Sequence, residues 1–463
     1  MTKAKAEEIS SEGEDNPVIE PVSYGTLHEE GVLIREPRLF TEKTIKYRKN
    51  FDISRGGLGV LEASFSYIKG SLSSGYVAIP LSFALLGLIP SLIVGILISI
   101  TNYFTMSQLD QIAADMNTNN VNYSQLVKKV LGGKFGYVSG VLQFLYCFGA
   151  ALAELVFTIR FVAGIACFFQ WKSICEEPSH QYAIVLFVIT PLLMITKMYQ
   201  LSYASLVASI IQISFYVFVI FFLLYNLTTD EFTKSQFINA ATRFDISALF
   251  EVFGVLMYTI SNATNPIEVR RSLANARSFP TVLKVGCFVT AAVSILLGCM
   301  GSILNEKKKL NEIILMELPS DDTVILSVEL LFVMSIAVNF LVFGFGIFEP
   351  LEKIDSVRAL IIHTRNKEVE FFKRYALRLC FVCIIFFLSI AIPNLTIVVS
   401  LVGSLNAGLL ILVFPAIMVL KYYKDLADKK RVKVLAHVIL LAGIFFTLTG
   451  TLINLEKIIF SPN

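Results

Sequence analysis

Residues 67–80 read YIKGSLSSGYVAIP and interrupt the first apolar stretch of the chain, residues 61–86. Two glycines and three serines fall within residues 70–75, and a proline follows at position 80. Gly and Ser weaken a helix, and Pro removes a backbone donor. A packing stripe of small residues fits less well, because Gly70 and Gly75 are five residues apart rather than four. The stretch predicts a membrane helix that breaks where it lines a cavity.

The sixth apolar stretch, residues 248–269, is interrupted in a similar way. Residues 254–266 read GVLMYTISNATNP, which places a polar run next to apolar residues. Asn is a poor helix former and is costly in lipid. The inner end of the helix is the alternative for residues 265–266, but Ser261 and Asn262 lie two turns or more inside. Corresponding breaks in two halves of a chain indicate an inverted-repeat transporter.

Eleven stretches are long and apolar enough for membrane helices of about 20 residues. They are residues 61–86, 90–113, 138–169, 181–197, 203–226, 248–269, 282–303, 323–348, 372–391, 394–420 and 434–455. We therefore expect an all-α polytopic membrane protein with a 5+5 inverted repeat, residues 60–226 and 248–420, and an extra helix at 434–455. This transporter domain would cover residues 56–456. Residues 1–55 are polar and are expected to form a disordered cytosolic tail.

Composition excludes several other classes of protein. The 463 residues are 55% hydrophobic and 16% charged, whereas soluble domains carry about 25% charged residues. A net charge of +3 gives no electrostatic basis for binding nucleic acid. Because residues 1–50 are polar, we expect no signal peptide before the first span. No enzyme motif or metal-ligand cluster stands in a fitting context. We expect neither an enzyme nor a metal site.

The Lys and Arg residues predict the orientation of the chain. With the N-terminus in the cytosol, the inner loops carry 21 of them and the outer loops six, which agrees with the positive-inside rule. The tail sequence EEGVLI at residues 29–34 fits an acidic dileucine sorting pattern or a chance match. A plasma membrane and a lysosome-like or vacuole-like membrane both remain open.

Two further expectations concern the predicted outer side. Asn226 begins an N-glycosylation sequon in the loop expected after the fifth span, unless it lies too near the membrane to be modified. The scattered cysteines predict no disulfide framework. Cys175, in a predicted loop, and Cys299, near a helix end on the same side, form the one pairing considered.

Several motifs resemble the amino acid/auxin permease family. Residues 69–75 and 79–83, with Gly87, are similar to its KGxIGxGxLxLPxAF…G pattern, most closely in the proton-coupled amino acid transporter branch. Further similar segments are residues 122–126, 131–136, 266–267, 278–280, 392–394, 401–404 and 414–415. The resemblance implies the fold of the bacterial leucine transporter (APC superfamily) and cation-coupled movement of amino acids. Ser73 replaces a family glycine, which predicts altered or narrower selectivity.

The resemblance also implies a substrate site. The amino acid carboxylate would meet backbone N–H groups around residues 71–75, and its ammonium would meet carbonyls near Ser261 and Asn262. The expected substrate-binding residues are Gly70, Ser71, Leu72, Ser73, Ser74, Gly75, Tyr146, Tyr258, Ser261 and Asn262.

The expected partners are an amino acid, the lipid bilayer and a coupling cation, with no other cofactor and a monomeric protein. The residues considered for coupling are Lys69, Ser74, Glu154, Ser335 and Asn339. The resemblance favours H⁺, and Na⁺ is the alternative. Two other acidic residues in apolar stretches, Glu251 and Glu329, are expected at membrane interfaces. A transporter fold that acts as an amino acid sensor through its N-terminal tail is the rival function.

Overall fold

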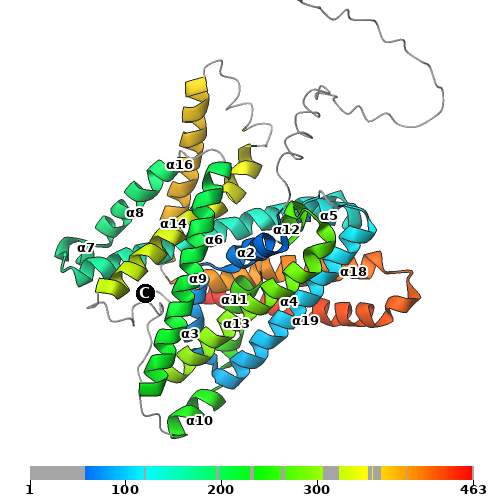
Figure 1. The fold of residues 1–463 in the computed structure, drawn as a ribbon, viewed down its shortest axis with the longest axis horizontal. Coiled ribbons are helices and arrows are strands. Elements are labelled where there is room, and N and C mark those ends of the chain that lie inside the picture. Colours follow the sequence, from blue (N-terminus) through cyan, green and yellow to red (C-terminus); the bar gives the residue numbers. More distant parts are fainter. Residues whose placement is uncertain are drawn as a thin grey trace, which may run out of the picture. The chain divides into compact units, whose positions relative to one another are not determined.

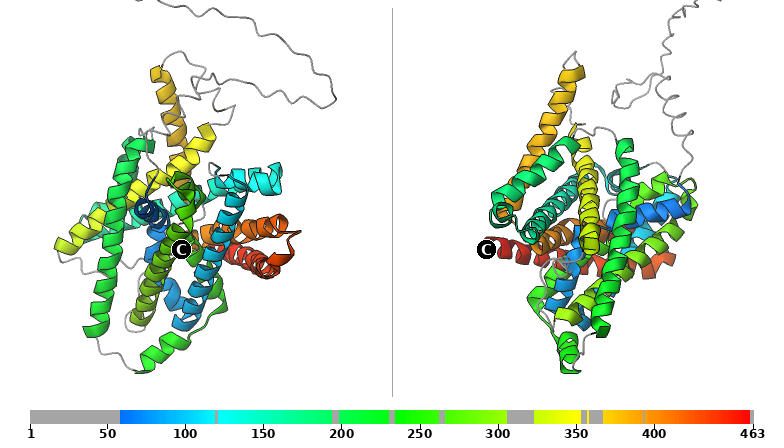
Figure 2. Two further views of the ribbon diagram at one scale, coloured as in Figure 1. Left: turned by 45° about the vertical axis from the view of Figure 1, so that its right-hand side comes forward. Right: turned by 60° about the vertical axis from the view of Figure 1, so that its left-hand side comes forward.

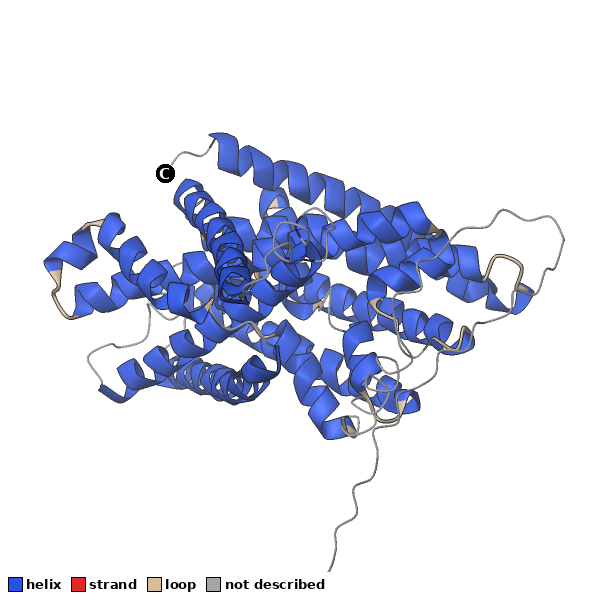
Figure 3. Cartoon of the chain, turned by 90° about the horizontal axis from the view of Figure 1, so that it is seen from above, coloured by secondary structure: helices blue, strands red, loops and turns tan. Residues whose placement is uncertain are grey.

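A computed structural model describes residues 58–118, 121–193, 198–229, 234–261, 266–305, 323–352, 357, 367–392 and 394–460. Within these ranges the backbone is helical almost throughout, as Figure 3 shows. The extended contact among them is one isolated bridge between Leu58 and Leu273.

Figure 1 labels most of the α-helices, and the described helical segments follow here in chain order. They are α2 (Val60–Ser71), η1 (Ser74–Ala78), α3 (Ile79–Leu86), α4 (Leu88–Asp115), α5 (Tyr123–Leu131), α6 (Gly133–Phe168), α7 (Lys172–Glu176), α8 (Pro178–Leu192), α9 (Met198–Thr229), α10 (Lys234–Thr242), α11 (Ile246–Ile260), α12 (Pro266–Ser272), η2 (Ala276–Ser278), α13 (Phe279–Asn305), α14 (Thr323–Glu352), α16 (Lys367–Ala391), α17 (Leu395–Val402), η4 (Gly403–Val413), α18 (Phe414–Tyr422), η5 (Ala427–Lys429) and α19 (Lys430–Phe460). Of the short segments, η1 is a 3₁₀-helix and η4 is a π-helix.

Eight of the described helices are long and apolar enough to cross a membrane. They are α4, α6, α9, α13, α14, α16, the continuous α17–η4–α18, and α19. The expected all-α polytopic membrane protein is thereby confirmed. The other three expected spans coincide with shorter pieces: α2, η1 and α3 for residues 61–86, α8 for 181–197, and α11 and α12 for 248–269. A count of eleven spans and the 5+5 repeat stay predictions.

Helix α13 supports the pieces of the first apolar stretch. It packs against α2, α3 and α4, and three of its glycines lie directly under α2 and α3. Gly286 meets the ring of Tyr67, whereas Gly298 and Gly301 meet Phe83 and Pro80. Small residues of this kind let helices approach closely in a membrane, where packing drives helix association. The two pieces of the broken first helix therefore pack closely against α13.

A second group of helices packs around α11. Helix α11 contacts α17, η4 and α19, and Figure 2 shows the red α19 beside the orange-red α18. A third group is formed by α14, which packs against α6 and α9, and η1 contacts α6, α11 and α17. The segment around Ser73 and Gly75 thus lies among helices from both halves of the chain.

A buried ion pair ties α12 to α4. Arg270 Nε donates to Asp110 Oδ1 at 2.6 Å, and Arg270 Nη1 donates to the carbonyl of Thr118 at 3.4 Å. Leu58 bridges to the residues that follow Arg270. Its N–H donates to the Ser272 carbonyl at 2.9 Å, and its carbonyl accepts from the Ala274 N–H. These contacts hold α12 to the chain on either side of it.

Cys175 forms a disulfide with Cys167, with their Cα atoms 4.7 Å apart. The expectation of no disulfide, and the pairing of Cys175 with Cys299, are therefore wrong. Cys167 was assigned to the interior of a span, but it lies at the end of α6. The turn at residues 169–171 brings α7, and with it Cys175, back toward that end. Cys299 is a free thiol.

The variant Cys175→Ala is expected to lower stability modestly. The disulfide closes a loop of eight residues, and releasing so short a loop costs about 2 kcal/mol. The checks are the thermal midpoint of the purified protein and thiol labelling without reductant. Cys299→Ala is the control and should change the midpoint less. Labelling of both Cys167 and Cys175 in the denatured, unreduced wild type would contradict the bond.

Asn226 lies within α9, three residues before the helix ends at Thr229. Its expected position in a loop is therefore wrong. The apolar pattern of residues 203–226 ended the helix too early, because α9 continues through Leu227, Thr228 and Thr229. Glycosylation of Asn226 stays a prediction.

Candidate functional site

The first helix breaks at Leu72 and Ser73. Helix α2 ends at Ser71, both following residues are extended (φ −67° and −149°), and η1 begins at Ser74. An extended pair between two helical pieces leaves carbonyl and N–H groups without partners inside the helix. At membrane depth such groups need partners from neighbouring elements or from a ligand.

Three helices supply hydrogen-bonding side chains to the backbone groups at this break. Tyr216 of α9 donates its hydroxyl to the Ser73 carbonyl at 2.8 Å, and Asn339 of α14 donates to the Leu72 carbonyl at 3.2 Å. The Ser74 N–H donates to Glu154 Oε1 of α6 at 3.3 Å. The structure thus brings together three of the coupling residues considered from sequence. Tyr216 is an addition that sequence reasoning missed, because one Tyr in an apolar run gives no signal of its own.

Helix α11 approaches the break from another side. A Cβ atom on Gly75 would lie 2.6 Å from Tyr258 Cδ1 and 3.1 Å from Thr259 Cγ2, so glycine is required for this contact. The Tyr258 ring in turn packs on the Tyr146 ring, with centroids 5.9 Å apart. Two aromatic residues predicted for the substrate site therefore lie together beside Gly75. Tyr76 completes this side by donating to the Thr259 carbonyl at 3.2 Å.

The second break follows α11, which ends at Ile260. Ser261 is extended and fully buried, and its hydroxyl contacts Met257 Sδ at 3.7 Å. The Ile260 carbonyl accepts a hydrogen bond from Asn102 of α4 at 3.4 Å. Helix α12 begins at Pro266, and Asn262 lies outside the described residues. Asn102 is a further polar residue at the break that the sequence did not reveal.

Several buried polar atoms at the first break lack hydrogen-bond partners among the described residues. They are the hydroxyl oxygens of Ser71, Ser73 and Ser74, and Oε2 of Glu154. All four side chains are at most 3% exposed. Native proteins leave few buried polar groups unpaired, because each one costs about 1–3 kcal/mol. Such a cluster beside a broken helix indicates a site for a ligand or for water.

The remaining coupling residues lie around this cluster. Lys69 is half-buried in the last turn of α2, next to the predicted substrate residue Gly70. Ser335 lies one turn before Asn339 on α14 and donates its hydroxyl to the Phe332 carbonyl. In the described part of the chain, no Lys or Arg forms an ion pair with Glu154.

Glu251 and Glu329, which were expected at membrane interfaces, are each only 5% exposed in the folded chain. Glu251 forms an ion pair with Lys457 of α19. Ser400 and Asn454 extend this polar contact, because Ser400 donates to the Glu251 carbonyl and Asn454 donates to the Ser400 hydroxyl. Helix α11, which precedes the second break, is thus tied to α17 and α19.

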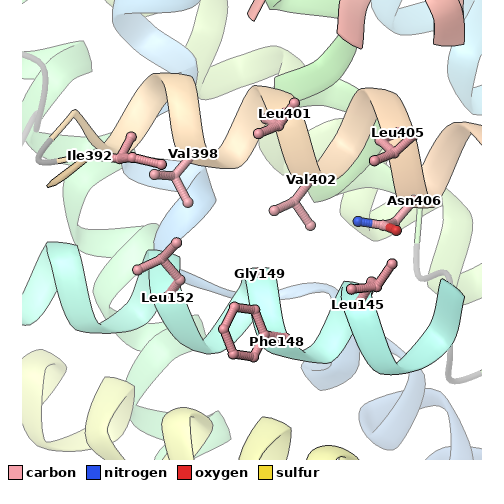
Figure 4. A pocket seen from close by; sticks show the side chains of 10 residues that line it. All are labelled: Leu145, Phe148, Gly149, Leu152, Ile392, Val398, Leu401, Val402, Leu405 and Asn406. Carbon is pink, nitrogen blue, oxygen red and sulfur yellow. The ribbon is translucent and has the colours of Figure 1, made fainter. Parts of the chain in front are cut away.

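An apolar groove with a volume of about 180 Å³ runs between α6 and α17–η4 (Figure 4). Its lining is Leu145, Phe148, Gly149, Leu152, Ile392, Val398, Leu401, Val402, Leu405 and Asn406. The amide of Asn406 is the polar group that Figure 4 shows at one end. The groove shares helix α6 with Tyr146, but neither Tyr146 nor the residues of the break line it.

Comparison with known proteins places the chain in a family and gives similar permeases. Residues 56–459 match the family model described as transmembrane amino acid transporter protein. Amino acid permease 8 of Arabidopsis thaliana is 23% identical over 262 residues, which are 52% of this chain and 54% of that permease. Amino acid permease 1 of the same plant is 24% identical over 261 residues, with the same coverage. The chain therefore spans about half the length of the permeases it matches.

Solved structures of transporters are similar in fold. The inward-facing structure of Mhp1 has a TM-score of 0.52 at 11% identity, covering 88% of this chain and 90% of Mhp1. A mutant of the Eremococcus coleocola manganese transporter has a TM-score of 0.51 at 12% identity, covering 93% of this chain and 91% of that protein. At these identities the likeness concerns the fold alone.

Proposed function

The chain belongs to the transmembrane amino acid transporter family, the amino acid/auxin permease family, and on that premise we propose that it moves amino acids by alternating access, coupled to a proton. Its matched relatives are permeases rather than enzymes, and transporters share its fold. The break at Leu72 and Ser73 carries the proposal, because it gathers unpaired polar groups at the meeting point of several helices.

The substrate would bind with its two charged ends on the two breaks. Its carboxylate would lie on the backbone N–H groups around Ser74, and its ammonium near the carbonyls that end α11, at Ile260 and Ser261. Discontinuous helices of transporters bind substrates in this manner. Tyr146 and Tyr258, packed beside Gly75, would contact the rest of the amino acid.

The topology in this proposal has eleven spans, a 5+5 repeat and a cytosolic N-terminus. The Cys167–Cys175 disulfide supports the orientation, because it lies in the segment that Lys and Arg counts place outside. Disulfides persist on the oxidising side of a membrane. The site is complete within one chain, which fits a monomer.

Glu154 is the proposed proton carrier. It is fully buried, it contacts Ser74 at the break, and its second oxygen has no partner among the described residues. The alternative is a Na⁺ ion, for which Ser74, Ser335, Asn339 and the Leu72 carbonyl would be the oxygen donors.

Uptake by proteoliposomes tests the proposal. We expect the purified chain to accumulate some of twenty tritiated L-amino acids, tested singly, when the outside is acidic and Na⁺ is absent. Accumulation that requires Na⁺ and ignores the pH gradient would replace H⁺ by Na⁺. Binding without flux would indicate a sensor, and neither binding nor flux would contradict the proposal.

The variant Ser73→Phe is expected to abolish this uptake while the protein still folds and inserts. Ser73 is 3% exposed at the break, and a phenyl ring there fills the space of the substrate. The control is Thr101→Phe, on a partly exposed part of α4, and it should transport like the wild type. Wild-type uptake by Ser73→Phe would remove the site from the break.

A further inference from the structure

The Ser74 N–H, which the proposed function assigns to the substrate's carboxylate, is already bonded to a carboxyl group of the protein. Glu154 Oε1 accepts from it at 3.3 Å, across 80 residues of sequence. Glu154 is fully buried, so this contact is a fixed part of the core and not a surface encounter. One N–H group cannot hold two carboxylates at full strength, and a substrate that binds there must displace Glu154.

We propose that Glu154 is a tethered competitor for the substrate's carboxylate, and that its protonation releases the site for the amino acid. The inference rests on the proposed function and adds to it a reason why the proton and the substrate bind together. The ionised carboxyl holds the N–H by a charge-assisted hydrogen bond, about twice as strong as a neutral one. The protonated carboxyl is a weaker acceptor and yields to the substrate.

The described groups around Glu154 offer its carboxylate no positive charge in an ion pair, so a proton is what neutralises it. Three tyrosine side chains lie near it, and all are uncharged at neutral pH: Tyr146 from its own helix, Tyr216 from α9 and Tyr258 from α11. Ser74 from η1 and Asn339 from α14 provide uncharged partners. Lys69, in the last turn of α2, is the cation near the break, but among the described residues no Lys, Arg or His forms an ion pair with Glu154. Two carboxylates in one buried site repel each other strongly, so the substrate anion enters only when Glu154 is protonated.

This arrangement balances one proton against one amino acid. A proton from the outer compartment binds to the carboxylate, the neutral side chain leaves the Ser74 N–H, and the substrate carboxylate takes its place. On the inner side the substrate departs, Glu154 loses its proton to the cytosol, and its carboxylate returns to Ser74. Glu154 Oε2, which has no partner among the described residues, is the atom open to the proton.

Equilibrium binding to the full chain in nanodiscs tests the proposal. The probe is a mixture of the twenty tritiated L-amino acids, with Glu154→Gln as the variant. In the wild type, the apparent Kd should rise about tenfold for each pH unit on the alkaline side, as expected when one proton binds with the ligand. In Glu154→Gln, the Kd should be nearly independent of pH and at least about tenfold lower than wild type at alkaline pH.

Glu329→Gln is the matched control. Glu329 is another buried acid, ten residues before Asn339 on α14, and thus about 15 Å along that helix from the break. It should keep the wild-type pH dependence. If Glu154→Gln is poorly folded, Glu154→Ala gives a second measurement with acetate as the probe. Acetate should compete with the amino acids at concentrations about tenfold lower than in the wild type, because it can occupy the vacated position.

The outcomes separate this inference from the proposed function. A wild-type slope in Glu154→Gln, or no gain of affinity at alkaline pH, would overturn the competitor role even though amino acids bind. If Glu154 carried the proton without competing for the Ser74 N–H, Glu154→Gln would show no gain of amino acid affinity at alkaline pH. Absence of amino acid binding by the wild type would instead overturn the proposed function, and the inference with it.

Discussion

Replacing Gly75 with valine is expected to reduce amino acid uptake by at least about a hundredfold, because displacing a binding group by 1 Å costs that much. Even the Cβ atom would lie 2.6 Å from the Tyr258 ring, closer than atoms can pack. Tyr258 is held in turn by Tyr146, so the ring cannot simply turn away. The two broken helices must separate, and the substrate groups on them separate as well. Uptake by proteoliposomes at equal protein content measures the loss.

Gly164→Val is the matched control for this variant. Gly164 lies in α6, and a Cβ atom there meets nothing within 4 Å. Its uptake should stay within about twofold of the wild type, since the change affects only helix propensity. Equal uptake by Gly75→Val and Gly164→Val would show that the contact of η1 with α11 has no part in transport.

Replacing Arg270 with methionine is expected to destabilise the protein by about 3–5 kcal/mol, the cost of leaving one partner of a buried ion pair unpaired. Arg270 is 4% exposed, and Asp110, its partner at 2.6 Å, is 9% exposed. The variant leaves the Asp110 carboxylate without its cation, and it also loses the bond to Thr118. Thermal unfolding of the purified protein in detergent measures the effect.

The neighbouring residue provides the comparison. Arg271 forms an ion pair with Glu268, but both side chains are more than 40% exposed. Exposed pairs contribute about 0–1 kcal/mol, so Arg271→Met should change the unfolding midpoint little. The double variant Asp110→Leu with Arg270→Met should recover much of the stability, because two apolar residues replace the pair. Similar midpoints for Arg270→Met and Arg271→Met would show that the Asp110 pair adds nothing.

Local sequence was sufficient to locate the two breaks. Gly, Ser and Pro at residues 70–80 act on the backbone of their own segment, so their effect can be read without neighbours. The pattern of apolar residues likewise located the long helices, with ends that differ by a few residues from the observed ones. Helix α9 shows the limit, since its last residues, 227–229, lie beyond the predicted span and are still helical.

Contacts between distant segments were beyond sequence reasoning. Glu154 was one of several acidic residues in apolar stretches, and its hydrogen bond to Ser74 exists only once α6 packs against η1. Tyr216 and Asn102 reach the breaks for the same kind of reason. The disulfide was missed because its Cys167 was counted inside a span. The π-helix η4 was also not expected, because its hydrogen-bond register does not follow from apolar periodicity.

The glycines of α13 determine how the two pieces of the first helix can move. Helices usually interlock through ridges of side chains that fit into grooves, and interlocked helices must unpack before either one slides. At Gly286, Gly298 and Gly301, the side chains of Tyr67, Phe83 and Pro80 occupy the space that a Cβ atom of α13 would take. The pieces of the first helix are therefore interlocked with α13, and we expect α2 and α3 to move together with α13 rather than to slide along it. A side chain introduced at any of these three glycines would push α2 or α3 away from α13.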